Sequence, residues 1–440
     1  MSMPRPGHGA GHPSHDGQID GPGPLRAAFS GLTTRGRSFL AAGAAAVGCA
    51  YLLGQPDLLR VGALLMVLPV VSVLVLHRTR TRVTAARRLS PQRMPAGEQG
   101  RVHLLLSNDA RLPSGVLMLQ DHVPYVLGPK PRFVLDRIEP GGRREVTYRI
   151  RSDLRGRYPL GPLQLRLADP FGMVELTRSY GTHDTLTVLP GIEPLPPVRF
   201  GGLARGDGVG MRGSLASAGE DDLIPREYRH GDDLRRVHWR STAHRGSLMV
   251  RREEQPRRAR CTVLLDTRRA GYVMGGVAAP FERAVSAAAS AISHLTRQGF
   301  EVRLLTDDGT QLPGPGTEVA DPYELTGRLM DFLAVVDHSA SLGFEPALAA
   351  QRAGSGELLL GFLGSVDPAQ AGVLGRMAAR AGGAAAFVVA GQLDPRIEGD
   401  RLTTLRNNGW TALAHHPGVP LGALWQQAAV EVSARGGGRS

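Results

Sequence analysis

Side chains able to take part in chemistry are densest in residues 225–256, a stretch that mixes acidic, basic and aromatic residues. Gly231 permits a tight turn, and Asp232 can cap a short helix by accepting hydrogen bonds from its free amides. The nearby arginines can return to these carboxylates in bidentate ion pairs. The candidate site consists of Arg226, Glu227, Tyr228, Gly231, Asp232, Arg235, Arg236, His238, Trp239 and Ala243.

Two interpretations of this stretch remain open. Tyr228 and Trp239 each join a large apolar ring to a polar tip, which suits either a junction between domains or a surface that binds a protein partner. Nucleic acid fits poorly although the formal net charge is +12, because carboxylates interleaved with the arginines repel phosphate.

Motifs for catalysis and cofactor binding are missing from the sequence. Lys130 is the only lysine and lies between two prolines, so there is no Walker-type loop, and the glycines at 206–210 lack the dinucleotide-binding pattern. No Gly-x-Ser-x-Gly elbow occurs. Cys49 and Cys261 lie in apolar segments and offer neither a disulfide framework nor a thiolate metal site. We therefore predict no catalytic residues, no cofactor and no enzymatic activity.

Strands alternate with helices over residues 261–435, which predicts a parallel, doubly wound α/β sheet. Ligands of such sheets gather at the carboxyl ends of the strands, and the first strand ends at Asp266. The expected strands are 261–266, 300–306, 358–363 and 385–390, and the expected helices are 280–298, 323–336, 368–381 and 421–434.

Residues 99–190 alternate between apolar and polar side chains, as in Val102, Leu104 and Leu106. Short strands punctuated by Pro and Gly predict an antiparallel β-sandwich of immunoglobulin type, a module that usually binds or spaces. We expect a linker over 191–219, followed by the chemistry-rich segment at 220–260.

Two apolar runs predict a transmembrane helical hairpin over residues 38–76, behind a disordered tail of residues 1–37. A pair of buried core helices is one alternative. Another is lipidation at Cys49, because Ala46–Cys49 faintly resembles a lipoprotein processing box.

Arginines flank the hairpin on both outer sides, so both termini are expected in the cytoplasm and the chain in the inner membrane as a multi-pass protein. A basic juxtamembrane linker is expected over 77–98. Its arginines can hold the protein against anionic headgroups, namely Arg78, Arg80, Arg82, Arg87 and Arg88.

A family resemblance is carried by the run from Glu227-Tyr228 through Gly231-Asp232 and Arg236–Trp239 to Ala243, closed by Leu248 and Glu253-Glu254. This run, before a strand that ends in Asp266, resembles the signature of domain-of-unknown-function family 58. The layout over residues 38–435 is similar too, with a membrane hairpin, a β module containing Asp169–Gly172 and a von Willebrand factor A-like α/β domain. The resemblance implies a non-enzymatic accessory protein that works beside a MoxR-type AAA+ ATPase, often with a transglutaminase-like membrane protein.

One departure concerns metal binding. A von Willebrand A domain that binds Mg²⁺ opens with Asp-x-Ser-x-Ser, and the corresponding positions here are Asp266, Arg268 and Ala270. An arginine in that pocket opposes cation binding, and Asp367 after a later strand adds only one carboxylate. We therefore expect a degenerate site at Asp266 that binds no metal. The family's arginine after Ala243 is replaced by His244.

The sequence leaves three possible functions of the chain to be tested. The first is a membrane-tethered scaffold that engages a cytoplasmic protein through the surface around 226–254 and the strand ends of the α/β domain. The second is a Mg²⁺-dependent von Willebrand A-type ligand-binding protein. The third is an unrecognised enzyme acting on cell-envelope precursors.

Overall fold

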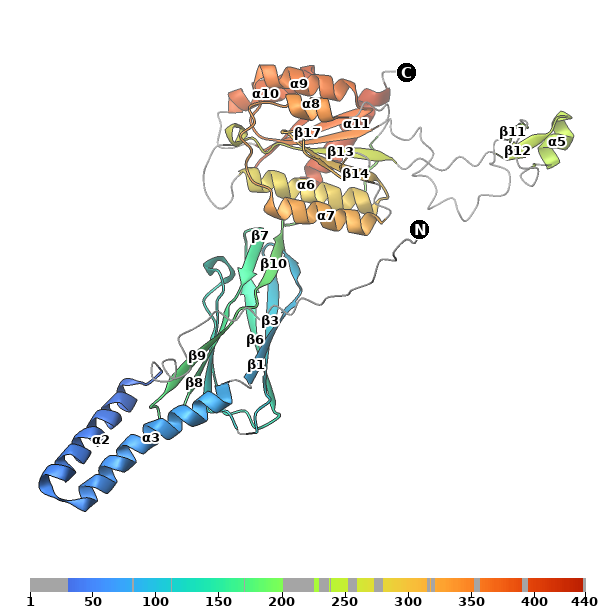
Figure 1. The fold of residues 1–440 in the computed structure, drawn as a ribbon. Helices are drawn as coiled ribbons and strands as arrows, with labels where there is room; N and C mark the ends of the chain where they lie inside the picture. Colours follow the sequence, from blue (N-terminus) through green and yellow to red (C-terminus); the bar gives the residue numbers. More distant parts are fainter. Residues whose placement is uncertain are drawn as a thin grey trace, which may run out of the picture. The chain divides into compact units, whose positions relative to one another are not determined.

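The computed structural model describes residues 31–80, 83–111, 113–169, 171–200, 225–228, 237, 239–251, 259–272, 280–314, 317, 321–351, 357–389 and 395–437. The chain divides into two compact units, residues 1–188 and 189–440 (Figure 1).

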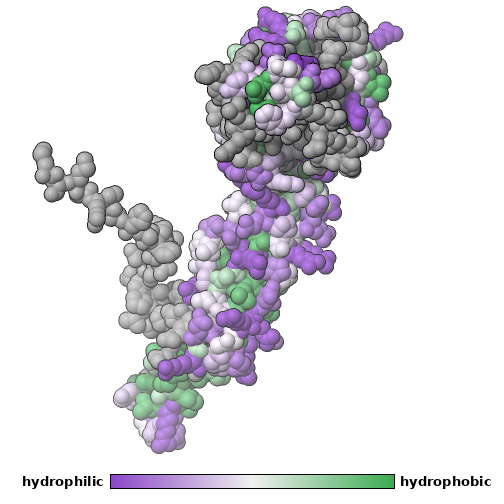
Figure 2. Space-filling view, turned by 90° about the vertical axis from the view of Figure 1, so that its right-hand side faces the viewer, coloured by the Kyte–Doolittle hydropathy of each residue, from purple (hydrophilic) through white to green (hydrophobic). Residues whose placement is uncertain are grey.

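The first unit begins with a helical hairpin, formed by α2 (Thr34–Leu53) and α3 (Pro56–Arg80). Both helices are long and apolar enough to cross a membrane, and most of their apolar side chains are exposed, as Figure 2 shows in the green surface at this end of the unit. Gly43 and Gly62 let the helices approach closely, because an added Cβ at Gly43 would lie 2.6 Å from Met66 Cγ. Two apolar helices are confirmed, and they are longer than the predicted 38–76.

The rest of the first unit contains three sheets. The first has the order β1 (Val83–Ser90), β3 (Gln99–Asn108), β6 (Arg143–Arg151), and the second has the order β2 (Arg93–Pro95), β10 (Asp184–Leu189), β7 (Gly156–Leu160). The third has the order β5 (Arg132–Leu135), β4 (Val116–Asp121), β8 (Leu163–Ala168), β9 (Glu175–Tyr180), and the 3-10 turn η1 (Tyr125–Leu127) follows β4. The strand pairs β1–β3, β3–β6, β10–β7, β4–β5, β4–β8 and β8–β9 are antiparallel. The predicted alternation is confirmed, since Val102, Leu104 and Leu106 are fully buried.

The expected linker over 77–98 is replaced by ordered structure. It contains the end of α3 and the strands β1 and β2. The expected role of Arg87 at the lipid surface is wrong, because its side chain is buried and pairs with Asp121, with Nη2 2.5 Å from Oδ1. Arg87 Nη1 also donates to the Leu160 carbonyl at 2.9 Å and to Asp184 Oδ2 at 3.0 Å.

Residues before α2 tie the hairpin to the β-rich part of the unit. Leu32 forms a β-bridge with Val174, and the Glu175 amide donates to the Gly31 carbonyl at 2.8 Å. Thr33 caps α2 by accepting from the Gly36 amide, while its amide donates to the Met173 carbonyl at 2.9 Å. The β-rich part therefore holds α2 at its first residue and α3 through β1.

The second unit contains a six-stranded sheet of order β15-β14-β13-β16-β17-β18. Five strands are parallel, and the edge strand β15 pairs antiparallel with β14. The strands are β13 (Arg260–Leu265), β14 (Glu301–Thr306), β15 (Gln311–Leu312), β16 (Leu358–Leu363), β17 (Gly383–Val389) and β18 (Thr411–His415). This is a doubly wound arrangement, so the predicted α/β sheet is confirmed.

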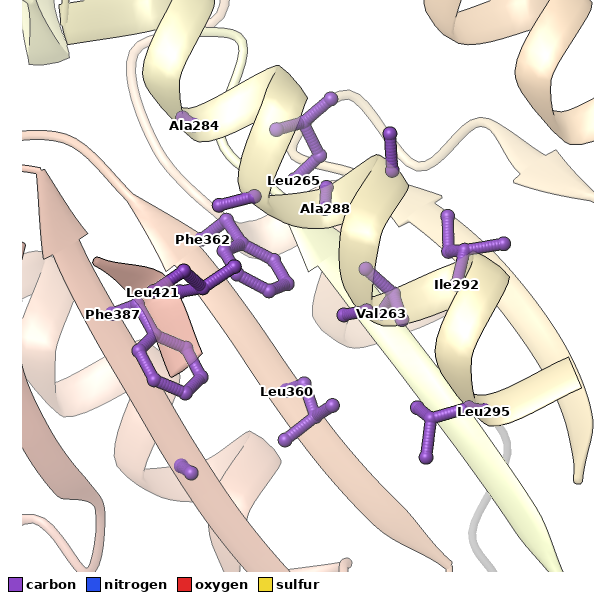
Figure 3. Close-up of a cluster of buried hydrophobic side chains, with 14 of the residues drawn as sticks. Val263, Leu265, Ala284, Ala288, Ile292, Leu295, Leu360, Phe362, Phe387 and Leu421 are labelled. Carbon is purple, nitrogen blue, oxygen red and sulfur yellow. The ribbon is translucent and has the colours of Figure 1, made fainter. Parts of the chain in front are cut away.

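Helices connect these strands. They are α6 (Pro280–Arg297), α7 (Pro322–Val335), α8 (Glu345–Ala350), α9 (Pro368–Ala379), α10 (Pro395–Asn407) and α11 (Leu421–Gly437), with the 3-10 turn η3 (Arg269–Gly271) after β13. Residues of β16 are buried on both faces, as expected for a central parallel strand. Figure 3 shows one core layer, where Val263 and Leu360 of the sheet meet Ala284, Ala288 and Ile292 of α6.

The segment 189–200 packs on this α/β core instead of forming the start of the expected linker. Phe200 contacts Trp425 edge-on, with ring centroids 5.0 Å apart. Ser286 Oγ donates to the Gly191 carbonyl, and the Leu421 amide donates to Glu193 Oε2 at 3.1 Å. The remainder of the expected linker, 201–219, lies outside the described residues.

Candidate functional site

The chemistry-rich stretch contains a small two-stranded antiparallel sheet, with a helix in the connection between its strands. β11 (Pro225–Glu227) pairs with β12 (Met249–Arg251), with Glu227 opposite Met249. The helix α5 (Trp239–Arg245) precedes β12. We call β11, α5 and β12 together the signature module.

Short contacts hold the described parts of the module together. The Tyr228 amide donates to the Leu248 carbonyl at 2.8 Å, continuing the strand pairing. Thr242 Oγ1 accepts from the Met249 amide at 3.0 Å, which joins α5 to β12. Met249 and Val237 are buried.

Trp239 is the most conspicuous side chain of the module, because 71% of its surface is exposed at the first residue of α5. Leu248 is also exposed. A tryptophan left open to solvent on a packed module is typical of a protein-binding surface, where aromatic side chains carry much of the affinity.

The structure places only part of the predicted site. Glu227, Tyr228, Trp239 and Ala243 are described with their side chains, and Arg226 is described in its backbone pairing with Val250. The remaining predicted residues lie outside the described residues: Gly231, Asp232, Arg235, Arg236 and His238. The predicted pairing of the arginines with Asp232 therefore stays a prediction.

A second cluster lies at the carboxyl ends of β13 and β16, where the strand order reverses. This switch point is where doubly wound sheets bind their ligands. Asp266 follows β13 and Gly364 follows β16, and the Gly364 amide donates to Asp266 Oδ2 at 3.0 Å.

Arg268 occupies this switch point. Its guanidinium pairs with Asp266 through two bonds, Nε to Oδ1 at 2.9 Å and Nη2 to Oδ2 at 2.8 Å. Nη2 also donates to the Ser365 carbonyl at 3.1 Å, and the guanidinium carbon lies 4.1 Å from the centre of the Phe344 ring. Both charged side chains are buried, so the positive charge lies in the region where a cation would be bound.

Asp307 forms a second buried carboxylate next to this pair. Its Oδ1 accepts from the Thr267 amide and hydroxyl, both at 2.6 Å, and its Oδ2 accepts from Ser339 Oγ at 2.7 Å. The loop of Ser339 runs beside residues 267–269, since the Ser339 amide donates to the Thr267 carbonyl at 2.7 Å. We call Asp266, Thr267, Arg268, Asp307 and Ser339 the switch-point cluster.

Burial is the main influence on the pKa values of Asp266 and Tyr272. Burial raises the pKa of Asp266, while the Arg268 guanidinium and the Gly364 amide act against that rise. Burial also raises the pKa of Tyr272, whose hydroxyl donates to the Asp266 carbonyl at 2.7 Å. Every carboxylate oxygen of the cluster accepts a hydrogen bond from the protein. The Arg268 guanidinium therefore supplies the positive charge that a bound cation would otherwise supply.

Sequence reasoning found Asp266 and Arg268 but missed Asp307 and Ser339. Asp307 directly follows the predicted strand 300–306. Its position at the carboxyl end of a strand could have indicated that it belongs to the same cluster as Asp266. Asp367, named as a second carboxylate, instead caps α9, because its Oδ1 accepts from the Gln370 amide at 2.8 Å. No group of three or more His, Cys, Asp or Glu suited to a metal ion occurs within the described ranges.

Comparison with known families gives one match. The sequence model of the family described as "Protein of unknown function DUF58" matches residues 225–315, as the resemblance predicted. This range covers the signature module, β13, α6 and β14, and it includes Asp266, Arg268 and Asp307. No curated protein sequence matches the chain.

Solved structures similar to parts of the chain include the CARDB domain of a Pyrococcus furiosus protein in complex with di-metal ions, at 11% identity over 24% of this chain and 89% of that one, with a TM-score of 0.18. An ASH/PapD-like domain of human CEP192 has 14% identity over 25% of this chain and 86% of that one, with a TM-score of 0.17. The Bacillus subtilis sporulation control protein Spo0M has 12% identity over 24% and 49%, with a TM-score of 0.16.

Proposed function

With residues 225–315 matching the DUF58 family model, we propose that the chain is a membrane-anchored, non-enzymatic scaffold that binds a cytoplasmic protein partner. The observation that carries the proposal is the exposed Trp239 on the signature module. A MoxR-type AAA+ ATPase is the proposed partner, together with a transglutaminase-like membrane protein, on the strength of the family resemblance.

The proposal assigns the two units different tasks. The β-rich part serves as an immunoglobulin-like spacer, which its short antiparallel strands support. The second unit serves as a von Willebrand A-like binding domain, supported by its doubly wound sheet and by Asp266 at the end of the first strand. The buried Arg268–Asp266 ion pair argues against the alternative of Mg²⁺-dependent ligand binding, because the carboxylate that would hold the cation already has a positive partner.

Membrane topology is part of the proposal. The arginines outside the hairpin support a topology with both termini in the cytoplasm and the connection at Gly54-Gln55 outside. Reporter fusions at Gly54-Gln55 and after Ser440 check this arrangement. We expect an external reporter signal only from the first fusion, and an external signal from the second would contradict the proposal.

Co-purification from detergent tests partner binding. We expect the full-length chain to enrich the AAA+ ATPase, and Trp239→Ala to lower the recovery by about thirtyfold, the effect of losing a contact worth about 2 kcal/mol. Tyr323→Ala is the matched control, because Tyr323 is an aromatic residue on α7 that is 84% exposed. Equal recovery by wild type and Trp239→Ala, or recovery of no ATPase by either, would refute the proposal.

A further inference from the structure

The turn between β8 and β9 presents an apolar side chain beside the start of the hairpin. Phe171 is 59% exposed. Asp169 holds the turn, because its carboxylate accepts from the backbone amides of Phe171 at 3.2 Å and Val174 at 2.7 Å. The ring is thus exposed on a turn that is fixed by its own hydrogen bonds.

Contacts with α2 fix this turn at the point where the helix begins. Thr33 Oγ1 donates to the carbonyls of Gly172 at 2.7 Å and Met173 at 3.0 Å. An added Cβ at Gly36 would lie 2.4 Å from the Met173 carbonyl oxygen, so the first turn of α2 passes directly against the turn. Any bilayer that α2 enters therefore lies next to Phe171.

The uncharged part of α2 is shorter than the whole helix. Ser38–Leu53 contains sixteen residues, which span about 24 Å at 1.5 Å per residue, and on α3 Leu68 and Val73 pack against the β-rich core. The hydrocarbon core of a typical bilayer is about 30 Å thick. A bilayer that thins to accommodate such a mismatch brings its headgroup boundary closer to the residues that flank the span.

Charged residues limit how far the β-rich part can follow. Arg166 of β8 pairs with Glu175 of β9 at 3.2 Å, and both side chains are partly exposed. Arg166 lies two residues before the end of β8, or about 7 Å along the strand. The turn can enter the lipid boundary, whereas this pair belongs at the level of the polar headgroups.

We propose that Phe171 inserts into the boundary between headgroups and acyl chains, in the leaflet where α2 begins. The basic first turn of α2, with Arg35 and Arg37 both exposed, faces the headgroups of the same leaflet. The β-rich part is then attached at three places, α2, α3 and Phe171, and cannot swing freely on the hairpin. This inference rests on the proposed membrane anchoring of the chain.

Fluorescence quenching by lipids tests the contact in the full-length protein, reconstituted in nanodiscs that contain anionic lipid. The native Cys49 lies exposed on α2, and Cys261 is buried, so an environment-sensitive thiol label attaches to Cys49 alone. In a Cys49→Ser background the label is attached to Phe171→Cys, and to Leu154→Cys as a control. Leu154 lies beyond β6 at the other end of the β-rich part, since Arg151 pairs with Gln99 whereas Val83, which follows the hairpin, pairs with Asn108.

Lipids with a quencher near the headgroup should remove most of the fluorescence at position 171 and leave position 154 unchanged. A quencher near the end of the acyl chain should act on Cys49. Quenching at Cys49 alone would overturn the Phe171 contact and leave the anchoring intact. Quenching at none of the three positions would overturn the anchoring itself, and equal quenching at 171 and 154 would overturn the inserted turn in favour of a β-rich part that lies flat on the bilayer.

Discussion

Replacing Arg268 by Met tests whether the guanidinium compensates the buried charge of Asp266. Removing one partner of a buried ion pair costs about 3–5 kcal/mol. Asp266 keeps two backbone donors, the amides of Arg268 and Gly364, each 3.0 Å away. We therefore expect the lower end, about 3 kcal/mol, or roughly two decades in the folding equilibrium constant. Met retains much of the side-chain volume beside Phe344, so the loss of stability reports the removed charge more than lost packing.

The loss should depend on pH. Burial already raises the pKa of Asp266 in the wild type, and removal of the guanidinium raises it further. A carboxyl whose folded-state pKa lies above its unfolded value contributes stability below the unfolded pKa that is lost as the pH rises through the folded pKa. The difference in stability between Arg268→Met and wild type should therefore be largest at about pH 8 and shrink toward about pH 5.

Denaturant titration followed by tryptophan fluorescence measures this difference. The chain's tryptophans, Trp239, Trp410 and Trp425, all belong to the second unit, and the latter two are fully buried. Arg269→Met is the matched control, because Arg269 is the exposed neighbour. A loss below about 1 kcal/mol at high pH, or one that is the same at both pH values, would refute the compensating role of the guanidinium.

Three further predictions concern other contacts. Arg87→Met leaves the buried Asp121 without its ion pair and should cost the first unit about 3–5 kcal/mol, measured by loss of near-ultraviolet circular dichroism on heating; an unchanged melting curve would contradict it. Gly43→Val places a side chain against Met66 and should destabilise the hairpin by about 1–3 kcal/mol, seen as faster proteolysis in detergent, whereas Gly48→Val, with open space around it, should match wild type. Burial lowers the pKa of His415, so the unfolded chain binds more protons there and stability falls as the pH drops below about 6.5; His415→Asn should flatten this fall in denaturant titrations, and an unchanged slope would count against the assignment.

Apolar periodicity was enough to predict most of the second unit. Strand β16 occupies the predicted residues, Leu358–Leu363, and helix α6 ends one residue before the predicted end. Periodicity did not reveal α10 (Pro395–Asn407), because this helix is largely polar and contacts the core through few residues, among them Leu402 and Leu405. Strand β18 is only five residues long and follows α10 closely, so it gave too short a pattern to separate from a loop.

Long-range pairing explains the other differences. Residues 83–95 were expected to be a basic linker because Arg87 and Arg88 interrupt any apolar pattern, yet Arg87 is buried against Asp121, 34 residues away. At the switch point, the arginine at a metal-ligand position was visible in the sequence, because Arg268 lies only two residues after Asp266. The contribution of Ser339 was not, since it depends on how the loop after α7 lies beside residues 267–269.

The pairing of residues 31–33 with residues 172–175 has a consequence for biosynthesis. Gly31–Thr33 leave the ribosome before the hairpin, but their partners are made about 140 residues later, after the hairpin and eight of the strands. The segment before α2 must therefore stay without these partners while α2, α3 and the first eight strands are synthesised. The contact closes only when β9 has been synthesised, so a chain truncated before β9 should leave the start of α2 without these partners.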